Sequence, residues 1–530
     1  MLIITPFILS AFIFPSAQAV DESSWNTLTP MPIARGGLGV AVVDGKIYAI
    51  GGIIGNLTVN NNEQYDPVIN QWTVKAPMPT ARTGFAIAVY NHKIYVIGGK
   101  VGGGFVGNNE VYDPSTNTWE TRASMPTPRS DFSACVVVDK IYLIGGQKYS
   151  SNDPFFAGTS VNEVYDPAND SWSAKAPVPM AVYGYASATL NNKIYIVGGS
   201  MSPASQQNGA LIVATQVYNP QTDNWSSAAN LPIATTYGAG AATEDYLAPS
   251  RLYLVGGYSN NVYSDKTQVY NPVNDSWSAG VSMSAPRAYL GLIVVNDVLY
   301  ALGGFDGQNW LNTNEMYKPF GYGTVPPKIQ ITSPENKTYS YVNVSFLVNR
   351  GFDWMGYSLD NQANVTVKPE IKFLNLTQGE HSLVLYANDS QGNMGFSDVI
   401  FFSIDSLPPK IVILAPQNQS YGTNDVQLTI AVNEPISKLV YSLDGQENKT
   451  IIGNVTLPAL PNGSHSLTVY ASDEVGNYAL KTVYFSIAPF PFIEVTAIAV
   501  IITIVLASGY LYYKHRKTSS SQVQQNKLVE

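Results

Sequence analysis

Short apolar runs alternate with polar turns along the first 320 residues, and the same pattern returns six times. A typical unit starts with the apolar residues 36–43, turns at Asp44-Gly45, and continues into a second apolar run that ends in Gly-Gly. A third run carries Tyr, Asp or Asn, and Pro, and a fourth carries Trp. Apolar runs of this length between turn residues predict β-strands joined by tight hairpins. We therefore expect four strands, named a to d, in each unit.

The Gly-Gly pairs give the period of the repeat. They are 47, 47, 53, 58 and 47 residues apart, at 51–52, 98–99, 145–146, 198–199, 256–257 and 303–304. A period near 50 residues with four strands in each unit is typical of a β-propeller, in which each unit is one blade. The fold class predicted for residues 20–320 is all-β, a six-bladed propeller.

The Trp residues indicate how the ring closes. Five units end in a Trp strand, at Trp72, Trp119, Trp172, Trp225 and Trp277. The sixth unit stops at Tyr317-Lys318-Pro319 without one, whereas Trp25 precedes the first unit. An unclosed ring leaves open sheet edges. We therefore expect residues 23–28 to supply the fourth strand of the sixth blade.

The joint pattern of Gly-Gly, Tyr-Asp-Pro and Trp resembles the Kelch repeat over about 300 residues. The resemblance implies a Kelch propeller. Kelch-type copper-radical oxidases need a Cys–Tyr pair and two His ligands. Here His92 is the only His of the propeller, and Cys135 is the only Cys of the chain. We expect no catalytic residue, no metal site and no cofactor.

A second repeat follows the propeller, at residues 326–405 and 408–488. Pro326-Pro327-Lys328 recurs 82 residues later as Pro408-Pro409-Lys410, and both copies carry Asp-x-x-Gly-Asn. Units of about 80 residues built from short strands predict two β-sandwiches. They resemble the immunoglobulin-like modules of prokaryotic surface proteins. Nine Asn-x-Ser/Thr sequons in this segment predict a glycosylated stalk.

The two ends of the chain predict secretion and anchoring. Residues 1–19 are apolar and end in Ala17-Gln18-Ala19, as in a secretory signal peptide. Residues 493–513 are long and apolar enough to span a bilayer, and a basic cluster at 514–517 follows them. We expect a single-pass type I membrane protein with the propeller and stalk outside the cell and residues 514–530 in the cytoplasm.

The overall charge excludes one class of partner. The chain has 29 Lys and Arg against 38 Asp and Glu, a net charge of −9. Nucleic-acid binding needs a concentrated basic surface, which this composition does not provide. We expect no nucleic-acid partner.

Loop length and loop composition indicate a binding face. Length variation falls in the b–c loops, which share one face of the propeller with the d–a crossovers, and variable loops on a scaffold commonly carry function. Their aromatic residues suit a glycan or protein ligand, although they could equally pack on each other. These candidates are Phe105, Tyr149, Phe155, Phe156, Tyr258, Tyr263, Phe305 and Trp310.

Two charged columns recur among the blades. Four units carry Arg before strand a, namely Arg35, Arg82, Arg129 and Arg287. The same four units carry Glu two residues before the Tyr of strand c, namely Glu63, Glu110, Glu163 and Glu315. The other two units have Val182 and Thr235 with Gln216 and Gln268. This covariation predicts ion pairs within blades; the alternative is an arginine ring that binds an anionic ligand.

The sequence favours a cell-surface recognition or adhesion protein that binds a glycan or a protein through the b–c loop face. One alternative is an extracellular carbohydrate-active enzyme, either a sialic-acid-mutarotase-like isomerase or a glycan hydrolase, but Asp153, Asp265 and Asp306 are scattered over three blades. Another is a structural module of the cell envelope.

Overall fold

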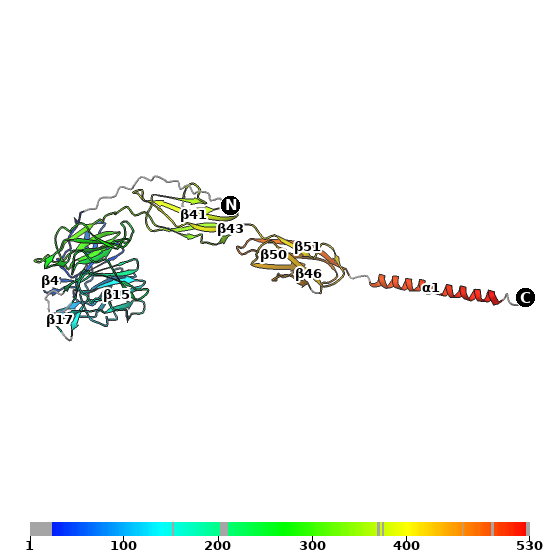
Figure 1. Ribbon diagram of the computed structural model, residues 1–530, viewed down its shortest axis with the longest axis horizontal. Helices are drawn as coiled ribbons and strands as arrows, with labels where there is room; N and C mark the ends of the chain where they lie inside the picture. Colours follow the sequence, from blue (N-terminus) through cyan, green and yellow to red (C-terminus); the bar gives the residue numbers. More distant parts are fainter. Residues whose placement is uncertain are drawn as a thin grey trace, which may run out of the picture. The chain divides into compact units, whose positions relative to one another are not determined.

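The computed structural model describes residues 24–150, 153–201, 210–367, 371–373, 376–457, 459–488 and 492–525 (Figure 1). The chain divides into two compact units, and each is described by itself. Unit 1 consists of Met1–Lys328, Val348–Trp354 and Ala387–Phe396, and unit 2 of Ile329–Leu347, Met355–Tyr386 and Ser397–Glu530. The expected signal segment, residues 1–19, lies outside the described residues.

Unit 1 contains six four-stranded antiparallel sheets, which are the blades of the propeller. Blades 1 and 2 contain β2 (Gly39–Val43), β3 (Lys46–Ile50), β6 (Asn62–Asp66), β7 (Gln71–Val74), β8 (Ala86–Tyr90), β9 (Lys93–Ile97), β12 (Asn109–Asp113) and β13 (Thr118–Arg122). Blades 3 and 4 contain β14 (Ser133–Val137), β15 (Lys140–Ile144), β18 (Asn162–Asp166), β19 (Ser171–Ala174), β20 (Ala186–Leu190), β21 (Lys193–Val197), β24 (Thr215–Asn219) and β25 (Asn224–Ala228). Blades 5 and 6 contain β26 (Ala239–Ala242), β27 (Leu252–Val255), β30 (Thr267–Asn271), β31 (Ser276–Ala279), β32 (Gly291–Val295), β33 (Val298–Leu302), β34 (Asn314–Tyr317) and β1 (Asn26–Thr27).

The sixth blade takes its outer strand from the start of the described chain. β1 pairs antiparallel with β34, with Asn26 opposite Met316 and Thr27 opposite Glu315. Trp25 stacks on Tyr317 with ring centroids 5.1 Å apart, and its Nε1 donates a 3.0 Å hydrogen bond to the carbonyl of Val281. The ring of blades is therefore closed by both backbone pairing and aromatic packing.

The Tyr and Trp residues of the repeat hold neighbouring blades together. In blade 1, Tyr65 packs on Trp72 with centroids 5.0 Å apart, and the Trp72 indole donates to the carbonyl of Thr29. In blade 2 the corresponding Trp119 donates to the carbonyl of Ala76. Each of these indoles reaches the segment before strand a of its own blade, where the chain crosses from the previous blade. The repeated aromatic residues are therefore scaffold.

The Gly-Gly pair is required where strand b ends. Gly51 and Gly52 have φ of 57° and 111°, conformations that glycine adopts without the steric cost of a Cβ. A Cβ on Gly52 would lie 2.7 Å from the carbonyl oxygen of Gly36. The pair lets strand b pass closely beside the segment before strand a, and this repeats in every blade.

Five b–c loops carry a small hairpin beyond the Gly-Gly pair. The hairpins are β4 (Ile53–Ile54) with β5 (Leu57–Thr58), β10 (Lys100–Val101) with β11 (Gly104–Phe105), β16 (Gln147–Ser150) with β17 (Asp153–Gly158), β22 (Ser200–Met201) with β23 (Ala210–Leu211), and β28 (Tyr258–Ser259) with β29 (Val262–Tyr263). In blade 6, a single bridge joins Phe305 to Trp310. In five of the six blades, β-structure therefore extends from the blade onto the b–c face.

The expectation that length variation falls in the b–c loops is wrong for blade 5, where the a–b loop has nine residues, 243–251, and the other blades have two. Within unit 1, the chain after β34 lies beside this a–b loop. The amide of Gly323 donates to the carbonyl of Leu247 in the a–b loop of blade 5, at 2.7 Å. That loop is held by the buried carboxylate of Asp297, which accepts hydrogen bonds from four backbone amides, those of Glu244, Tyr246, Leu247 and Ala248. The chain therefore leaves the propeller on the face of the a–b turns, opposite the b–c loops.

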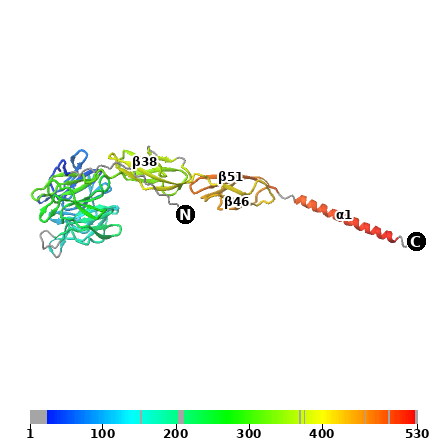
Figure 2. The ribbon, with the colours of Figure 1, turned by 45° about the horizontal axis from the view of Figure 1, so that its top comes forward.

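After the propeller, the chain forms two modules that repeat a pair of sheets (Figure 2). The first contains β35 (Ile329–Ser333), β36 (Thr338–Tyr339), β37 (Val342–Val348), β38 (Trp354–Leu359), β39 (Val365–Thr366), β40 (Ile371–Phe373), β41 (Gly379–Asn388), β42 (Met394–Phe396) and β43 (Ile400–Ile404). The second contains β44 (Ile411–Ala415), β45 (Ser420–Tyr421), β46 (Val426–Val432), β47 (Lys438–Leu443), β48 (Lys449–Thr450), β49 (Val455–Leu457), β50 (Gly463–Ser472) and β51 (Tyr478–Ile487). Leu428, Leu467 and Val469 are fully buried in the core of the second module.

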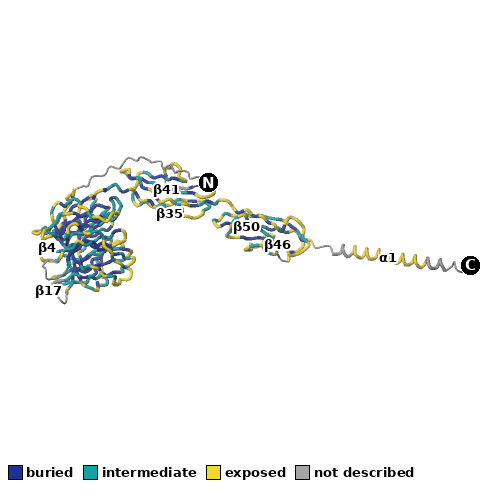
Figure 3. Tube along the Cα trace, viewed as in Figure 1, coloured by how far each residue is buried: buried dark blue, intermediate teal, exposed yellow. Residues whose placement is uncertain are grey.

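The last described element is the helix α1 (Phe492–Gln525). Its segment Ala497–Thr518 has a mean hydropathy of 1.6 and is long and apolar enough to cross a membrane by length and composition. The residues of this segment are exposed, as the yellow tube in Figure 3 shows. In the same figure, buried residues are concentrated in the strands of the propeller and of the modules.

Each module has a buried His near the start of a ten-residue strand, paired with an exposed Asp from the preceding segment. In β50, His465 Nδ1 lies 2.8 Å from Asp444 Oδ2, and Nε2 lies 2.8 Å from the carbonyl oxygen of Pro461. Both neighbours are acceptors, so the doubly protonated ring satisfies both contacts. Burial would lower the pKa of His465, but the hydrogen bonds to Asp444 and to Pro461 outweigh it and raise this pKa. His381 and Asp360 repeat the pair in β41, with the pKa of His381 also raised.

We predict that the second module loses stability as the pH rises. A His whose folded-state pKa is raised contributes stability that is complete below its unfolded pKa, about 6.5, and is lost as the pH passes the folded pKa. Hydrogen-exchange protection of β50 amides, corrected for intrinsic rates, should therefore be higher at about pH 5.5 than at about pH 8. His465→Gln should reduce this difference in β50 but leave it unchanged in β41. Equal protection of wild-type β50 at both pH values would contradict the assignment.

Candidate functional site

The aromatic residues expected to form a binding platform pack largely on each other. Phe105 and Tyr149 meet edge to face with centroids 4.8 Å apart, across the loops of blades 2 and 3. Across blades 5 and 6, successive ring contacts of 5.2, 5.7 and 4.8 Å link Tyr258, Tyr263, Phe305 and Trp310. Of these six, Tyr149 is the most open, with 62% of its surface exposed. The side chains of Phe155 and Phe156 lie outside the described residues.

The four arginines of the charged column are fully buried and paired within their blades. Arg35 and Arg82 lie 2.7 and 2.6 Å from Glu63 and Glu110. Arg287 lies 2.6 Å from Glu315, and Arg129 pairs with Glu163. Each arginine has 0% of its surface exposed, so none can reach a ligand, and we do not assign them to a binding site. Burial lowers the pKa of Arg82, Arg129 and Arg287, and the partner carboxylates oppose this shift.

In the two blades without arginine, neutral side chains make the hydrogen bonds at the position that the Arg–Glu pair occupies in the other four. In blade 5, Gln268 accepts from the amide of Ile233 at 2.9 Å and donates to Thr235 Oγ1 at 3.2 Å. In blade 4, Gln216 accepts from the amide of Met180 at 2.8 Å. The two sequence positions vary together because the buried polar groups at this place are paired either as Arg with Glu or as neutral residues with Gln.

A closed circle of backbone hydrogen bonds surrounds the channel on the b–c face. Six residues, one from each blade and two positions after the arginine column, each donate their amide to the carbonyl of the equivalent residue in the preceding blade. The N···O distances are 2.8, 3.3, 2.8, 2.9, 2.6 and 2.9 Å for the donors Gly37, Gly84, Asp131, Gly184, Tyr237 and Tyr289. All six have positive φ, between 53° and 63°. We call these residues the inner ring.

Three inner-ring positions carry side chains in a conformation that favours glycine. Asp131, Tyr237 and Tyr289 have φ of 55°, 53° and 58°. A non-glycine residue in this region costs roughly 1–3 kcal/mol, and such strain is concentrated at functional sites. The inner ring and the first residues of the a strands line a cavity of 280 Å³. This cavity is the candidate functional site.

Three tyrosines approach Asp131 at the cavity. The rings of Tyr237 and Tyr289 are 4.4 Å apart, and those of Tyr183 and Tyr237 are 6.4 Å apart. Burial raises the pKa of Tyr237 well above its usual value, and the negative charge of Asp131 adds to the shift. The pKa of Tyr289 is raised for the same two reasons, in the same order. The phenols therefore stay neutral beside a carboxylate.

The carboxylate of Asp131 is balanced by a lysine from the neighbouring blade. Lys100 Nζ lies 2.9 Å from Asp131 Oδ2 and 3.0 Å from Gln147 Oε1. Ser130 Oγ donates to the same carboxylate oxygen at 2.8 Å. The ammonium of Lys100 also lies over the ring of Phe105, 5.4 Å from its centroid. The cavity is thus connected through Lys100 to the aromatic residues of the b–c loops.

The inner ring was missed by the sequence reasoning, although a signal was present. When the six units are aligned on the arginine column, the second following position reads Gly, Gly, Asp, Gly, Tyr, Tyr. Three of the six blades have glycine at this position and three have a larger residue. The larger residues indicate that these blades depart from the repeated pattern there. Only the structure shows that these positions meet around the channel.

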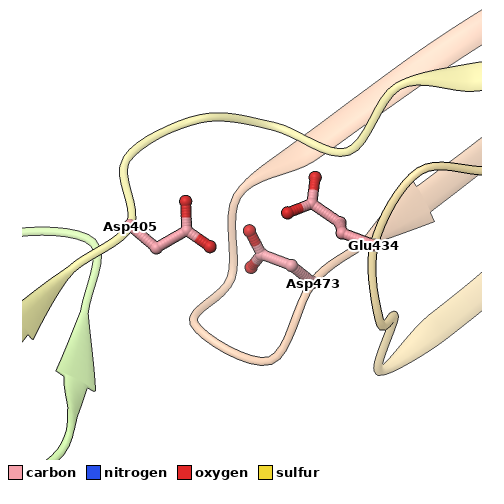
Figure 4. A group of neighbouring side chains, drawn as sticks. All are labelled: Asp405, Glu434 and Asp473. Carbon is pink, nitrogen blue, oxygen red and sulfur yellow. The ribbon is translucent and has the colours of Figure 1, made fainter. Parts of the chain in front are cut away.

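In unit 2, three acidic side chains from distant positions point toward one another. Asp405, Glu434 and Asp473 place carboxylate oxygens within 4.8 Å of each other (Figure 4), a group of ligand atoms of the type that holds a metal. Burial raises the pKa of Glu434, and the charges of Asp405 and Asp473 add to this. The sequence analysis named no metal ligand, because these residues are far apart along the chain.

The preceding repeat has a cation at the corresponding position. Asn349 and Asn433 play equivalent roles, since each accepts from the amide of the Lys in Pro-Pro-Lys. The next residue is Arg350 in the first copy and Glu434 in the second. Within unit 1, Arg350 Nη2 lies 2.7 Å from Asp389, the counterpart of Asp473. The second copy therefore has a carboxylate where the first has a guanidinium.

Comparison with known proteins places these features in a family context. A family model described as the Attractin/LZTR1 beta-propeller matches residues 47–316. Kelch-like protein terF of Aspergillus terreus is 30% identical over 174 residues, 32% of this chain and 36% of that protein. Kelch-like protein 35 of Mus musculus is 28% identical over 144 residues, 27% of this chain and 22% of that protein. The chain spans about a third or less of the length of these curated relatives.

One solved structure, "Structure of YjhT", aligns with the chain at a TM-score of 0.46 and 18% identity. The alignment covers 55% of this chain and 97% of that chain.

We predict that the buried ion pairs are structural and interchangeable with the neutral pair of blade 5. Arg82→Thr alone should destabilise unit 1 by about 3–5 kcal/mol, because it leaves the Glu110 carboxylate buried without its partner. Adding Glu110→Gln copies the Thr235–Gln268 arrangement and should restore much of the loss. Denaturant unfolding of the two single variants and the double variant measures the coupling. Additive losses in the double variant would contradict this assignment.

We also predict that Glu434 destabilises unit 2 at neutral pH. An acid whose folded-state pKa is raised is most favourable when protonated, so stability should increase as the pH falls through that pKa. Glu434→Gln should raise the melting temperature of unit 2 at pH 7 in buffer with a chelator, and Glu447→Gln, at an exposed position outside the cluster, serves as the control. A lower melting temperature for Glu434→Gln would show that the three carboxylates do not repel.

Proposed function

The chain belongs to the Attractin/LZTR1 beta-propeller family and carries a Kelch-type propeller, and from this premise we propose that it is a cell-surface recognition protein that binds a glycan or protein ligand through its b–c face. The observation that carries the proposal is the cavity inside the inner ring on that face, with three strained side chains. Kelch propellers typically act as protein-binding scaffolds, so binding is the expected activity. No cofactor takes part in this proposal.

The b–c face offers ligand-binding chemistry in addition to the cavity. Tyr149 is exposed there, next to Phe105 and Lys100, and the aromatic group of blades 5 and 6 lies on the same face. Exposed aromatic residues beside polar groups are enriched at recognition surfaces. Although packing contacts fix these rings, fixed rings lose less conformational entropy on binding.

The cavity favours binding over hydrolysis. Among the described residues that line it, Asp131 is the one carboxylate, and it is paired with Lys100. Most glycoside hydrolases use two carboxylates on either side of the bond that they cleave. Asp265 and Asp306 belong to other blades, and the side chain of Asp153 lies outside the described residues.

Exposed sequons support the proposal of a glycosylated stalk. Seven of the nine sequon asparagines in residues 326–488 are exposed, namely Asn336, Asn343, Asn364, Asn418, Asn448, Asn454 and Asn462. Asn388 is half-buried, and Asn375 lies outside the described residues. Oligosaccharides can only be accommodated at exposed positions.

The helix α1 supports the proposal of membrane anchoring. Its apolar residues up to Tyr513 are followed by Lys514, Arg516 and Lys517, as expected on the cytoplasmic side. The chain leaves the propeller beside the a–b loop of blade 5, on the face opposite the b–c loops. The exit point of the chain therefore does not lie among the b–c loops.

The proposal predicts that one exposed residue of the b–c face contributes to binding. The full chain in nanodiscs would be applied to arrays of immobilised glycans and purified surface glycoproteins. Tyr149→Ser should weaken capture several-fold, because it removes an exposed aromatic contact. Val68→Ser, 87% exposed at a c–d turn on the opposite face, should have no effect. Equal capture by both variants, or turnover of an arrayed glycan, would contradict recognition through this face.

A further inference from the structure

The inner ring is built so that each larger side chain covers the ring residue of the preceding blade. A Cβ on Gly84 would lie 2.8 Å from Asp131 Oδ1, and a Cβ on Gly184 would lie 3.0 Å from the Tyr237 ring. Tyr289 in turn packs against Tyr237, with the two rings tilted by 34°. Gly184 has no side chain with which to cover Asp131. The carboxylate therefore lines the cavity, as do the two tyrosines.

The cavity is small. Its volume of 280 Å³ is at the lower end of the range for ligand sites, about 300–1,000 Å³. The floor is formed by small residues at the start of the a strands, among them Ala86, Ala186 and Ala239. A space of this size accepts one six-membered ring with its substituents and not a folded peptide segment. The occupant is therefore the end of a larger ligand or a free small molecule.

The charges at the cavity are balanced. Among its described lining residues Asp131 is the one charged group, and Lys100 neutralises it from outside the lining. A cationic ligand would compete with Lys100 for the carboxylate of Asp131. An anionic ligand would be repelled by this carboxylate, and no further cation lines the described part of the cavity to offset the repulsion. Both would be unfavourable in a site with restricted solvent access. The electrostatics favour an uncharged ligand.

The polar groups at the cavity suit a ligand with many hydroxyl groups. Within the described part of the chain, the hydroxyls of Tyr237 and Tyr289 make no hydrogen bond, and both residues are half-buried. A phenol can donate and accept, whereas the carboxylate of Asp131 only accepts. The carbon atoms of both rings at the cavity lining offer apolar surface to the C–H groups of a sugar. Aromatic surface together with these polar groups is complementary to a pyranose ring.

We infer that the cavity inside the inner ring binds one uncharged pyranose residue of a glycan, with Asp131 accepting from its hydroxyls and with Tyr237 and Tyr289 contacting its apolar face. This inference rests on the proposed function, because it takes the b–c face to be the recognition face. Beyond the proposed function, the inference specifies the class of ligand and assigns binding to three inner-ring residues, which are distinct from the aromatic residues of the b–c loops. The strain at Asp131, Tyr237 and Tyr289 is then explained, since glycine at these positions would remove the contacts to the sugar.

The test measures binding of single sugars to the full chain in nanodiscs by ligand-observed NMR. The panel contains uncharged hexoses and N-acetylhexosamines, with glucuronic acid and glucosamine as acidic and basic probes. At least one uncharged sugar should bind, and the acidic and basic probes should bind at least ten times more weakly. Preference for a charged probe would overturn the assigned ligand class.

Two variants that respect the backbone of the inner ring locate the site. Tyr289→Gly restores the residue that other blades carry at this position, and Asp131→Asn keeps a residue that tolerates positive φ. Each should weaken binding of the sugar at least ten-fold without lowering the melting temperature of the propeller, and Tyr149→Ser should leave it unchanged. Unchanged binding in both ring variants would overturn the inference. If no sugar binds while Tyr149→Ser still weakens capture on the arrays, the inference fails and the proposed function stands. If neither effect is seen, both fail.

Discussion

The pairing of β1 with β34 is the contact on which the rest of unit 1 depends. Without it, blade 6 would end at β34 and leave an open edge. Trp25 strengthens this closure by stacking on Tyr317 and donating to Val281 in the crossover from blade 5 to blade 6. Because the strand comes from the opposite end of the propeller sequence, the ring closes only when all six blades are in place. The inner ring of backbone hydrogen bonds can form a complete circle only under this condition.

Closure separates the residues that build the scaffold from those that are available to a ligand. The Gly-Gly pairs, the Tyr–Trp contacts and the buried Arg–Glu pairs all satisfy polar groups or fill space between strands. Blades 4 and 5 meet the same requirement with glutamine and without charge. The inner ring differs, because its geometry is met best by glycine and three positions depart from glycine. Asp131, Tyr237 and Tyr289 therefore add polar and aromatic side chains to the lining of the cavity.

Much of the fold could be predicted from the sequence because its causes are local and repeated. Gly-Gly, Tyr-Asp-Pro and Trp each recur at a fixed place in the unit, and the missing sixth Trp pointed to Trp25. The four arginines were harder to interpret, since a charge that recurs in several blades can either bind a ligand or form an ion pair within the blade. Their covariation with Glu63 and its equivalents favoured ion pairs, and the burial of all four arginines removes them from the candidate site.

The aromatic loop residues were located by sequence, but whether Phe105 contacts a ligand or Tyr149 depends on contacts between blades. Asp131, Tyr237 and Tyr289 were missed for the same reason, and so were the converging carboxylates of Asp405, Glu434 and Asp473.

The central claim is that the ligand is bound where the inner ring departs from glycine. A crystal structure of the propeller with an uncharged monosaccharide tests it most directly. The account predicts density for one sugar ring against Tyr237 and Tyr289, with a hydroxyl within hydrogen-bonding distance of Asp131. Density for the sugar among the b–c hairpins, with the inner-ring cavity empty, would contradict it.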